Sequence, residues 1–409
     1  MPVVYLRKGN LARLARGHPW IYANEVAKVT GEPRDGEVVK VSDYRQRPLG
    51  CGLFNSKSQI VVRRVSNRAS VDIDAGFLCK RIQAAWNYRL RSLGDMTCCR
   101  VVNSESDFLP GLIVDKYGDR LVLQTLTLGM DLRKKEILEA LEAIFRASAI
   151  VERNDAAVRK LEGLEQTKRM LKGTEADARF ETVFGGLKFE VDLLEGHKGG
   201  IYLDQRVNHQ VVSRHACGRR VLDAFSYEGG FALQCAANGA KSVTAVEISE
   251  ASARRVGENA KRNGFDAVVS VVNQNAFDFL KNADAQQNAP APGNPDAAPP
   301  ARPSAAYDLI VLDPPSFTRN KESLPDALRG YKEINLRACK LLGQAGLLAT
   351  FCCSHHVDRE LFLDVVLDAA TDAQRTLRLV STLGQSPDHP ILPAVPETEY
   401  LKGFLFEVL

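Results

Sequence analysis

The chain has 409 residues, enough for two or three domains, and its 45% apolar and 25% charged residues are ordinary for a globular protein. It has no apolar run near the roughly 20 residues of a membrane helix, no secretory pattern in residues 1–10 and nine irregularly spaced cysteines, so we expect a cytoplasmic protein without membrane association or a disulfide framework. The net charge is +4, but residues 1–70 alone carry +8, which favours a polyanion such as nucleic acid over a merely solvated basic surface.

The first 70 residues are predicted to form a small β domain. Residues 38–41 and 59–63 are short β-branched segments between turns rich in Gly, Pro and Asn, as an all-β barrel requires. Residues 17–22 place Trp20 and Tyr22 beside His18 and close to two arginines. Aromatic and basic side chains in alternation stack on bases and neutralise phosphates, although Trp20 is better explained as a core residue.

Residues 74–190 are predicted to form a mixed α+β domain. An apolar stripe through Phe77, Ile82 and Trp86 indicates a helix over residues 74–93. Three strand-like segments, a second helix and a hairpin around Gly185 and Gly186 follow, at residues 100–103, 112–114, 121–124, 132–145 and 180–192. We place a domain boundary near this hairpin.

Residues 193–409 alternate between strands and helices, which predicts a doubly wound, Rossmann-like α/β domain. Strands are expected at residues 220–225, 243–246, 268–272, 307–312, 346–352, 376–382 and 400–408, and helices at 229–238, 249–263, 325–342 and 357–370. Residues 284–306 are rich in Ala, Pro, Gln and Asn and cannot bury enough apolar surface to order themselves. We therefore expect a disordered insertion there.

Polar residues follow the first three strands of this domain in the order that a nucleoside-bearing cofactor requires. Asp223 ends the first strand and precedes a loop in which Gly229 and Gly230 allow close approach of the backbone. Glu247, 24 residues after Asp223, ends the second strand, where an acid suits ribose hydroxyls. Asn275 follows the third strand, where an amide can read an adenine edge. Because the loop is not G-x-G-x-x-G, a dinucleotide is not indicated.

The fourth strand leads into Asp313-Pro314-Pro315, where the two prolines end the strand and stiffen the loop after it. Asp313 therefore lies at the carboxyl end of a central strand, where ligands bind in open α/β sheets. With Phe317 as a flat apolar face, this loop suits a planar, hydrogen-bonding nucleobase. Taken alone, the pattern fits an ordinary strand exit equally well.

The fifth strand ends in Cys352 and Cys353, and His355 and His356 follow. Because side chains alternate along a strand, one of the two thiols should point toward the Asp313 loop, as a nucleophile for an electron-poor carbon. The alternative is that both cysteines are small core residues. The four side chains cannot easily converge on one tetrahedral zinc ion, so we predict no metal site.

Together these motifs resemble the PUA-domain-bearing, S-adenosylmethionine-dependent methyltransferases that modify carbon 5 of cytosine in ribosomal RNA, of the large-subunit methyltransferase I type. The matching segments extend over nearly the whole chain, at residues 17–22, 200–206, 225–231, 312–317, 353–354, 388–390 and 400–404. Residues 203–206, Leu-Asp-Gln-Arg, and residues 400–404, Tyr-Leu-Lys-Gly-Phe, are the most specific of them.

The resemblance implies a PUA barrel over residues 1–70, a central domain over 74–190 and a methyltransferase domain over 193–409. It implies that Cys353 attacks carbon 6 of the cytosine and that Asp313 holds the protonated base nitrogen, so that carbon 5 takes the methyl group. The cofactor would be S-adenosylmethionine, held by Gln205, Arg206, Asp223, Phe225, Gly229, Gly230, Glu247, Asn275, Ala276 and Asp313. The RNA would meet Pro314, Pro315, Phe317, Lys321 and His18.

The chain departs from the family pattern at three places besides the unusual insertion. Glu228 stands where the family usually has threonine, Asn275 where many members have aspartate, and His355 follows Ser354 where glycine is common. These departures concern the cofactor contacts more than the reaction. Two alternatives stay open, methylation of an exocyclic amine without a thiol and an RNA-binding scaffold without catalysis. RNA, ribosomal RNA above all, is the predicted partner, and the oligomeric state is open, with a homodimer as one candidate.

Overall fold

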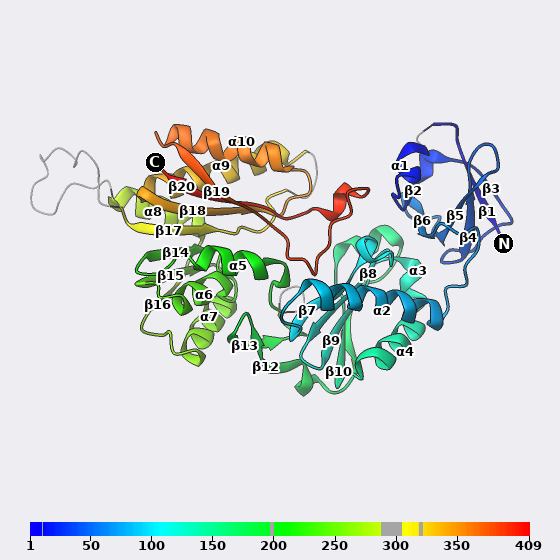
Figure 1. The fold of residues 1–409 in the computed structure, drawn as a ribbon, viewed down its shortest axis with the longest axis horizontal. Helices are drawn as coiled ribbons and strands as arrows, with labels where there is room; N and C mark the ends of the chain where they lie inside the picture. The colour runs from blue at the N-terminus through cyan, green and yellow to red at the C-terminus, as the bar shows by residue number, and fades with distance from the viewer. Residues whose placement is uncertain (10, 197–199, 288–304, 319–321) are drawn as a thin grey trace, which may run out of the picture. The chain divides into compact units, whose positions relative to one another are not determined.

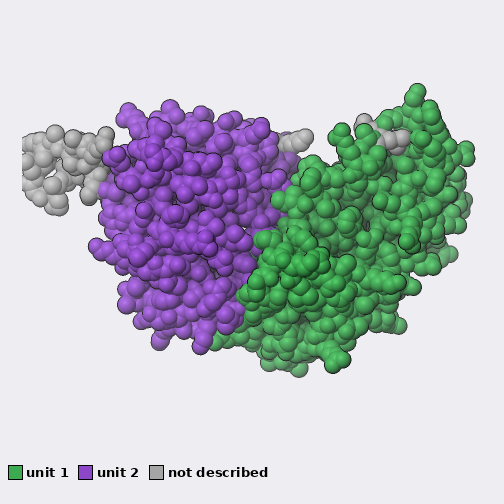
Figure 2. Space-filling model, viewed as in Figure 1, with its two compact units in different colours: residues 1–182, 191–203, 387–398 green, residues 183–190, 204–386, 399–409 purple. Residues whose placement is uncertain are grey.

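The computed structural model describes residues 1–9, 11–196, 200–287, 305–318 and 322–409. By its contacts the chain divides into two compact units, shown in different colours in Figure 2. Unit 1 consists of residues 1–182, 191–203 and 387–398, and unit 2 of residues 183–190, 204–386 and 399–409. Residues 387–398 thus belong to unit 1, although the chain on both sides of them belongs to unit 2.

The first part of unit 1 is the predicted small β domain. Its elements are β1 (Val3–Leu6), α1 (Leu11–Ala15), β2 (Trp20–Tyr22), β3 (Val26–Thr30), β4 (Val38–Ser42), β5 (Pro48–Phe54) and β6 (Ile60–Ser66). The strands form one six-stranded sheet in the order β2-β6-β5-β4-β1-β3. Apolar side chains, among them Val4, Val41 and Val62, form its buried core, because β-branched residues alternate along these short strands.

The second part of unit 1 is a five-stranded sheet packed against two helices. Its elements are α2 (Ala75–Ser92), β7 (Cys98–Asn103), β8 (Leu112–Tyr117), β9 (Arg120–Thr125), α3 (Leu128–Asp131), α4 (Lys134–Phe145), β10 (Ala149–Asn154) and β11 (Thr167–Lys172). The sheet has the order β11-β10-β9-β8-β7, and α2 and α4 bury their apolar sides against it. The helix predicted over residues 74–93 is confirmed: Asp74 caps α2 by accepting a hydrogen bond from the backbone of Phe77 at 2.7 Å.

Glu162 joins the two sheets of unit 1. Its side chain is 3% exposed and accepts hydrogen bonds from Ser58 at 2.6 Å, Arg63 at 2.8 Å and Asn55 at 2.9 Å, all in the N-terminal β domain. Burial raises the pKa of Glu162, but the Arg63 guanidinium and the hydrogen bonds lower it more, so the net shift is downward. The carboxylate is therefore ionised at neutral pH and holds the two sheets together.

Replacing Glu162 with glutamine should destabilise the protein by about 3 kcal/mol at pH 7, because Arg63 loses its buried partner. Since the folded-state pKa of Glu162 is lowered, its stabilisation is present above the unfolded pKa of about 4.3 and is lost as the pH falls through the folded-state value. Urea unfolding of both proteins from pH 7 down into the acid range measures this, with the exposed Glu165→Gln as control. An equal difference at every pH would contradict the prediction.

Unit 2 is built on one seven-stranded sheet with helices on both faces. Its elements are α5 (Arg206–Ser213), β14 (Arg220–Ala224), α6 (Gly230–Ala237), β15 (Ser242–Glu247), α7 (Glu250–Arg262), β16 (Val269–Asn273), α8 (Ala276–Gln287), β17 (Tyr307–Leu312), α9 (Leu324–Leu341), β18 (Leu342–Cys352), α10 (Arg359–Asp372), β19 (Leu377–Gly384) and β20 (Lys402–Val408). In Figure 1, α9 and α10 lie on one face of the sheet and α5, α6 and α7 on the other. The predicted doubly wound α/β fold is confirmed.

The strand order of this sheet is β16-β15-β14-β17-β18-β20-β19, and the first five strands run parallel. β20 follows every other strand in the chain, yet it lies between β18 and β19 and is antiparallel to both. The order reverses between β14 and β17, and ligands of open α/β sheets bind at the carboxyl ends of the strands beside such a point. Asp223 on β14 and Asp313 after β17 lie at these two ends.

Before this sheet, β12 (Arg179–Phe184) and β13 (Leu187–Asp192) form the hairpin predicted around Gly185 and Gly186. The expected insertion at residues 284–306 is wrong at its start, because residues 284–287 form the last turn of α8. There Asp284 is buried and pairs with Arg337 of α9, and Leu280 anchors the same helix in the core. Residues 288–304 lie outside the described chain.

Candidate functional site

The loop between β14 and α6 has a strained backbone. Phe225, Tyr227 and Gly229 all have left-handed conformations, with φ of 68°, 50° and 86°. This region is natural for glycine but costly for two bulky aromatic residues, and such strain gathers where a ligand approaches the chain. The predicted strand therefore ends at Ala224, one residue earlier than expected, and Phe225 already belongs to the loop.

Asp223 is a buried carboxyl group at the base of this loop. Its Oδ2 atom accepts a hydrogen bond from the Ala232 amide at 2.9 Å, and its Oδ1 atom has no hydrogen-bond partner within the described chain. Burial raises the pKa of Asp223 to about 8, and the charges of Asp313 and Glu247 add to the shift. A buried acid with one unused oxygen fits a ligand that brings a cation or a hydrogen-bond donor.

Glu247, at the carboxyl end of β15, is held in a single orientation. Its Oε2 atom accepts from the Tyr227 amide at 2.9 Å and its Oε1 atom from the Ser249 amide at 2.8 Å. The next residue, Ile248, is 66% exposed, which gives this edge of the sheet an apolar face beside a carboxylate. Sequence reasoning missed Ile248, although an apolar residue directly after an acid at a strand end was visible.

Asn275 stands directly before α8 instead of in an open loop. Its side-chain oxygen accepts a hydrogen bond from the Phe277 amide at 2.8 Å, which caps the helix. One lone pair of the oxygen is thus used in the cap, and the contact of the Asn275 amide with adenine stays a prediction. Ala276, the first residue of α8, is buried beneath it.

Gly230 is required by helix packing. A Cβ atom at this position would lie 2.5 Å from the His209 ring on α5, so only glycine fits. His209 is buried against Phe231, with ring centroids 4.4 Å apart, and burial lowers its pKa to about 3, so the ring is neutral. Of the two glycines singled out in the sequence, Gly229 supplies the positive φ and Gly230 the close approach to α5.

Residues 204–206 and 400–404, from the most specific segments of the resemblance, meet in unit 2. The Tyr400 hydroxyl donates to the Asp204 carboxylate at 2.7 Å. Gln205 is buried and accepts from Asn208 at 2.6 Å. The guanidinium of Arg206, also buried, lies 4.8 Å from the centre of the Phe184 ring. These contacts order the start of α5.

Glu228, one of the departures from the family pattern, faces α7. Its carboxylate pairs with Arg255 at 2.9 Å, and the side chain is buried. The extra acid therefore has a partner of its own. Asp223 and Glu247 keep their places at the strand ends.

The Asp313 loop and the end of β18 come together. The Cys353 Sγ atom lies 3.8 Å from the Pro314 carbonyl oxygen, within reach of a weak thiol hydrogen bond. Cys352 is fully buried in the sheet core, so Cys353 is the thiol that points toward the loop. The loop is also held by Ser316, whose hydroxyl lies 2.9 Å from that of Ser354. The site can thus offer a thiol and a carboxyl group on adjacent strand ends.

The residues expected to contact RNA differ in how far they are exposed to solvent. Pro315 is exposed, but Phe317 packs among aromatic rings, with centroids 4.6 Å from Tyr331 and 5.5 Å from Phe277. Phe317 is thus partly buried, and its stacking on a base stays a prediction. His18 is buried in unit 1, where its ring nitrogens lie 2.8 Å from Arg13 and 3.3 Å from Glu397, so it offers no open face for stacking.

Of the other expected RNA contacts, Pro314 is buried and Lys321 lies outside the described chain. The described residues contain no cluster of His, Cys, Asp or Glu that could hold a metal ion. They also contain no helix long and apolar enough to cross a membrane.

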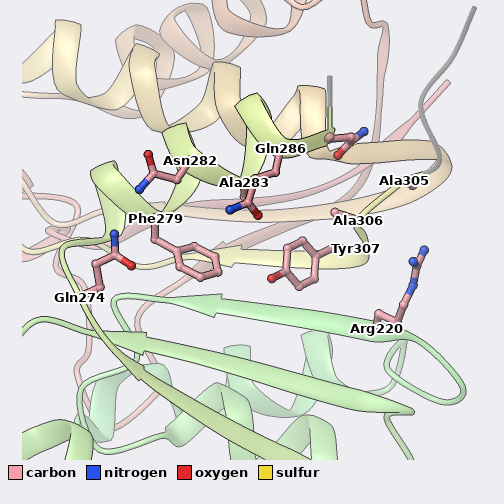
Figure 3. Close-up of a pocket in the computed structure, with 10 residues that line it drawn as sticks. Arg220, Gln274, Phe279, Asn282, Ala283, Gln286, Ala305, Ala306 and Tyr307 are labelled. Atoms are coloured by element: carbon pink, nitrogen blue, oxygen red, sulfur yellow. The ribbon is translucent and has the colours of Figure 1, made fainter. Parts of the chain in front are cut away.

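A cavity of about 550 Å³ lies elsewhere in unit 2, between α8 and the first residues of β14 and β17 (Figure 3). The rings of Phe279 and Tyr307 and the amides of Asn282 and Gln286 line it. None of the predicted site residues does. The guanidinium of Arg220, which also lines the cavity, pairs with Asp308 at 2.8 Å. We therefore assign no catalytic role to the side chains of this cavity.

Comparison with known proteins identifies two domains and relatives along the whole chain. A model of PUA-like domains matches residues 4–67, and a model of S-adenosylmethionine-dependent methyltransferases matches residues 157–287. The chain is 38% identical to ribosomal RNA large subunit methyltransferase I of Tolumonas auensis, over 99% of both chains. It is 36% identical to the protein of the same name from Klebsiella pneumoniae, over 100% of this chain and 98% of that one.

The solved structures that are similar to the whole chain include two methyltransferase structures. The structure of SMU.776 complexed with SAH has a TM-score of 0.83 at 22% identity, and it covers 100% of both chains. A Streptococcus mutans protein described as a SAM-dependent methyltransferase has a TM-score of 0.81 at 20% identity, with the same coverage. At these identities the likeness shows the fold.

Proposed function

Because this chain belongs to the family of ribosomal RNA large subunit methyltransferase I, we propose that it methylates carbon 5 of a cytosine in large-subunit ribosomal RNA, with S-adenosylmethionine as methyl donor. The observation that carries the proposal is the Cys353 thiol, 3.8 Å from the Pro314 carbonyl oxygen beside Asp313. Methylation of an exocyclic amine needs no thiol, whereas carbon 5 becomes reactive only after a nucleophile adds to carbon 6.

In the proposed reaction, the Cys353 thiolate adds to carbon 6 of the cytosine and forms a carbon–sulfur bond. The electrons of the 5,6 double bond form a new double bond between carbons 4 and 5, whose pair later attacks the methyl group. Those of the double bond between carbon 4 and nitrogen 3 move onto nitrogen 3, and Asp313 holds the proton that this nitrogen takes up. Carbon 5 then takes the methyl group, which is what S-adenosylmethionine supplies when bound. A base removes the carbon-5 proton, the carbon–sulfur bond breaks, and Cys353 leaves as the thiolate.

The residues proposed to hold the cofactor surround the strained loop. Asp223 would accept from the amino group through its unused oxygen, and Glu247 would accept from ribose hydroxyls. The backbone of the loop at Phe225 and Gly229 would approach the ligand closely. Ala276 at the start of α8 and Gln205 and Arg206 at the start of α5 complete the proposed set by resemblance to the family.

Bisulfite sequencing of large-subunit ribosomal RNA tests this function directly. Cells without the protein should lose protection at one cytosine, and the wild-type gene should restore it. Loss of protection at no cytosine would contradict the proposal. Loss of a different methyl group, detected by mass spectrometry of the same RNA, would favour methylation of an amine.

The basic N-terminal domain is proposed to bind the RNA backbone. Lys8, Arg16 and Arg45 are exposed there, within the segment that carries the net charge of +8. Changing all three to glutamine should weaken binding to a ribosomal RNA transcript and flatten its salt dependence, because fewer counterions are released. Filter binding over a range of salt concentrations measures both.

The matched control replaces three exposed lysines of unit 2, Lys241, Lys261 and Lys281, with glutamine. We expect this variant to keep the wild-type affinity and salt slope. An equal effect of the two triple variants would show that the charge acts without regard to its place in the chain, against the proposal.

A further inference from the structure

Lys402 is a buried lysine at the start of β20. Its side chain is 3% exposed, and it pairs across the sheet with Cys352 at the end of β18. Lysine is almost never fully buried unless its charge is paired. Among the described residues, Lys402 forms no ion pair with a carboxylate, so its burial needs another reason.

The ammonium group of Lys402 holds the backbone that carries Cys353. Its Nζ atom donates to the Ser354 carbonyl at 2.7 Å and to the Tyr400 carbonyl at 2.9 Å. Ser354 directly follows Cys353, and its hydroxyl lies 2.9 Å from both Tyr331 and Ser316. The cation therefore ties the end of β18 to β20, while Ser354 ties it to the Asp313 loop.

Two carbonyl oxygens do not require a charged donor. A neutral amide could donate to both without the cost of taking an ammonium group out of water. A buried positive charge next to a thiol has a chemical use, because it favours the thiolate, which is the reactive form of cysteine. We propose that Lys402 is a positioning residue that holds Cys353 toward the Asp313 loop and stabilises its thiolate. This inference rests on the proposed function, in which Cys353 is the nucleophile.

Other ionisable side chains lie around the same strand end, namely Asp313 after β17, Tyr331 on α9, Arg359 on α10, Glu399 before β20, and Cys352, His355 and His356 on β18 and the loop after it. Arg359 already pairs with Glu399 at 2.9 Å. Burial raises the pKa of Tyr331, so its hydroxyl is neutral at pH 7. Asp313 opposes Lys402, because a carboxylate disfavours a nearby thiolate.

The relation between Lys402 and the thiols is mutual. Burial lowers the pKa of Lys402 and sets the net direction, and the negative charges of the Cys352 and Cys353 thiolates offset part of that shift. Each charge therefore favours the other. Because Cys352 is fully buried in the core, Cys353 is the thiol in which this charge pair can serve a reaction.

The test measures alkylation of Cys353 by iodoacetamide as a function of pH, with each cysteine followed by mass spectrometry of its peptide. Exposed Cys217 in the same protein is the internal reference. In the wild type, Cys353 should become reactive at a lower pH than Cys217. In Lys402→Met and Lys402→Gln, its rate at pH 7 relative to Cys217 should fall about tenfold, as the thiolate fraction falls. Lys402→Arg, which keeps the charge, should retain most of the reactivity.

Neutral variants that alkylate with the wild-type pH profile would overturn the inference. If neither neutral variant folds, the wild type still decides, because a Cys353 that titrates with or above Cys217 would also overturn it. The readout needs neither RNA nor S-adenosylmethionine, so it is independent of the proposed function. Methylation that survives in Cys353→Ala would refute that function while leaving the alkylation result intact.

Discussion

Replacing Cys353 with alanine is expected to lower the rate of methylation by about 10³-fold or more, because the reaction loses the nucleophile that makes carbon 5 reactive. Affinity for S-adenosylmethionine, measured by calorimetry, should stay at the wild-type value, since none of the proposed cofactor residues lies on β18, the strand that leads to Cys353. A second measurement uses RNA with 5-fluorocytosine at the target position. The wild type should remain covalently bound to it, because fluorine cannot leave as the carbon-5 proton does, and the variant should not.

The matched control is Cys352→Ser, the neighbouring thiol that is buried in the sheet core. It should keep most of the methylation rate, and it should still form the covalent complex. Full activity in Cys353→Ala would contradict the carbon-5 mechanism and favour methylation of an exocyclic amine, for which Asp313 would serve as a hydrogen-bond acceptor alone. Absence of S-adenosylmethionine binding in the wild type would instead favour an RNA-binding scaffold.

Replacing Asp223 with asparagine should weaken S-adenosylmethionine binding by about ten- to a hundredfold, the usual contribution of a hydrogen bond to a charged group.

Binding of S-adenosylmethionine to the wild type should also depend on pH. The Asp223 carboxyl group has a pKa of about 8 and is mostly protonated at pH 7, whereas a bound cation favours the ionised form. Binding should therefore release a proton, and affinity should rise as the pH increases toward 8.

Calorimetry in two buffers with different ionisation enthalpies measures this proton release. The Asp223→Asn variant should release none at this position, and its affinity should vary less with pH. Asp308→Asn is the matched control, since Asp308 lies at the start of β17 and pairs with Arg220. Wild-type binding heats that are equal in both buffers would contradict the proposed role of Asp223.

Local patterns in the sequence were enough to predict the α/β sheet of unit 2 and the polar residues at the ends of its strands. Asp223, Glu247 and Asp313 each follow a short apolar segment, and the carboxyl ends of parallel strands meet at one edge by the geometry of the fold. Alternation along β18 reduced the nucleophile to one of two cysteines. The choice of Cys353 depended on the resemblance, and the contact with Pro314 agrees with it.

The errors arose where tertiary contacts decide a residue's role. α8 was missed because most of its residues are polar. Its few apolar residues become buried only through packing, which includes the contact with α9. His18 looked like a ligand contact, but it is buried and its ring nitrogens contact Arg13 and Glu397. Lys402 lies in a segment that the resemblance singled out, but the sequence predicted no role for it. Its neighbour in the sheet, Cys352, is 50 residues away in the chain.

The position of β20 inside its sheet also sets an order of assembly. A ribosome makes this strand after all the others, yet β18 and β19 have no hydrogen-bonded neighbour on their facing edges until it inserts between them. A nascent chain can form the parallel part of the sheet, from β16 to β18, before β20 is made. Until then the edges of β18 and β19 that will face β20 stay unpaired, and such open edges are prone to mispairing. Since Lys402 arrives with β20, the thiol end of β18 receives its buried cation only at this final step. A newly made chain is therefore expected to gain a fully formed site only when β20 closes the sheet.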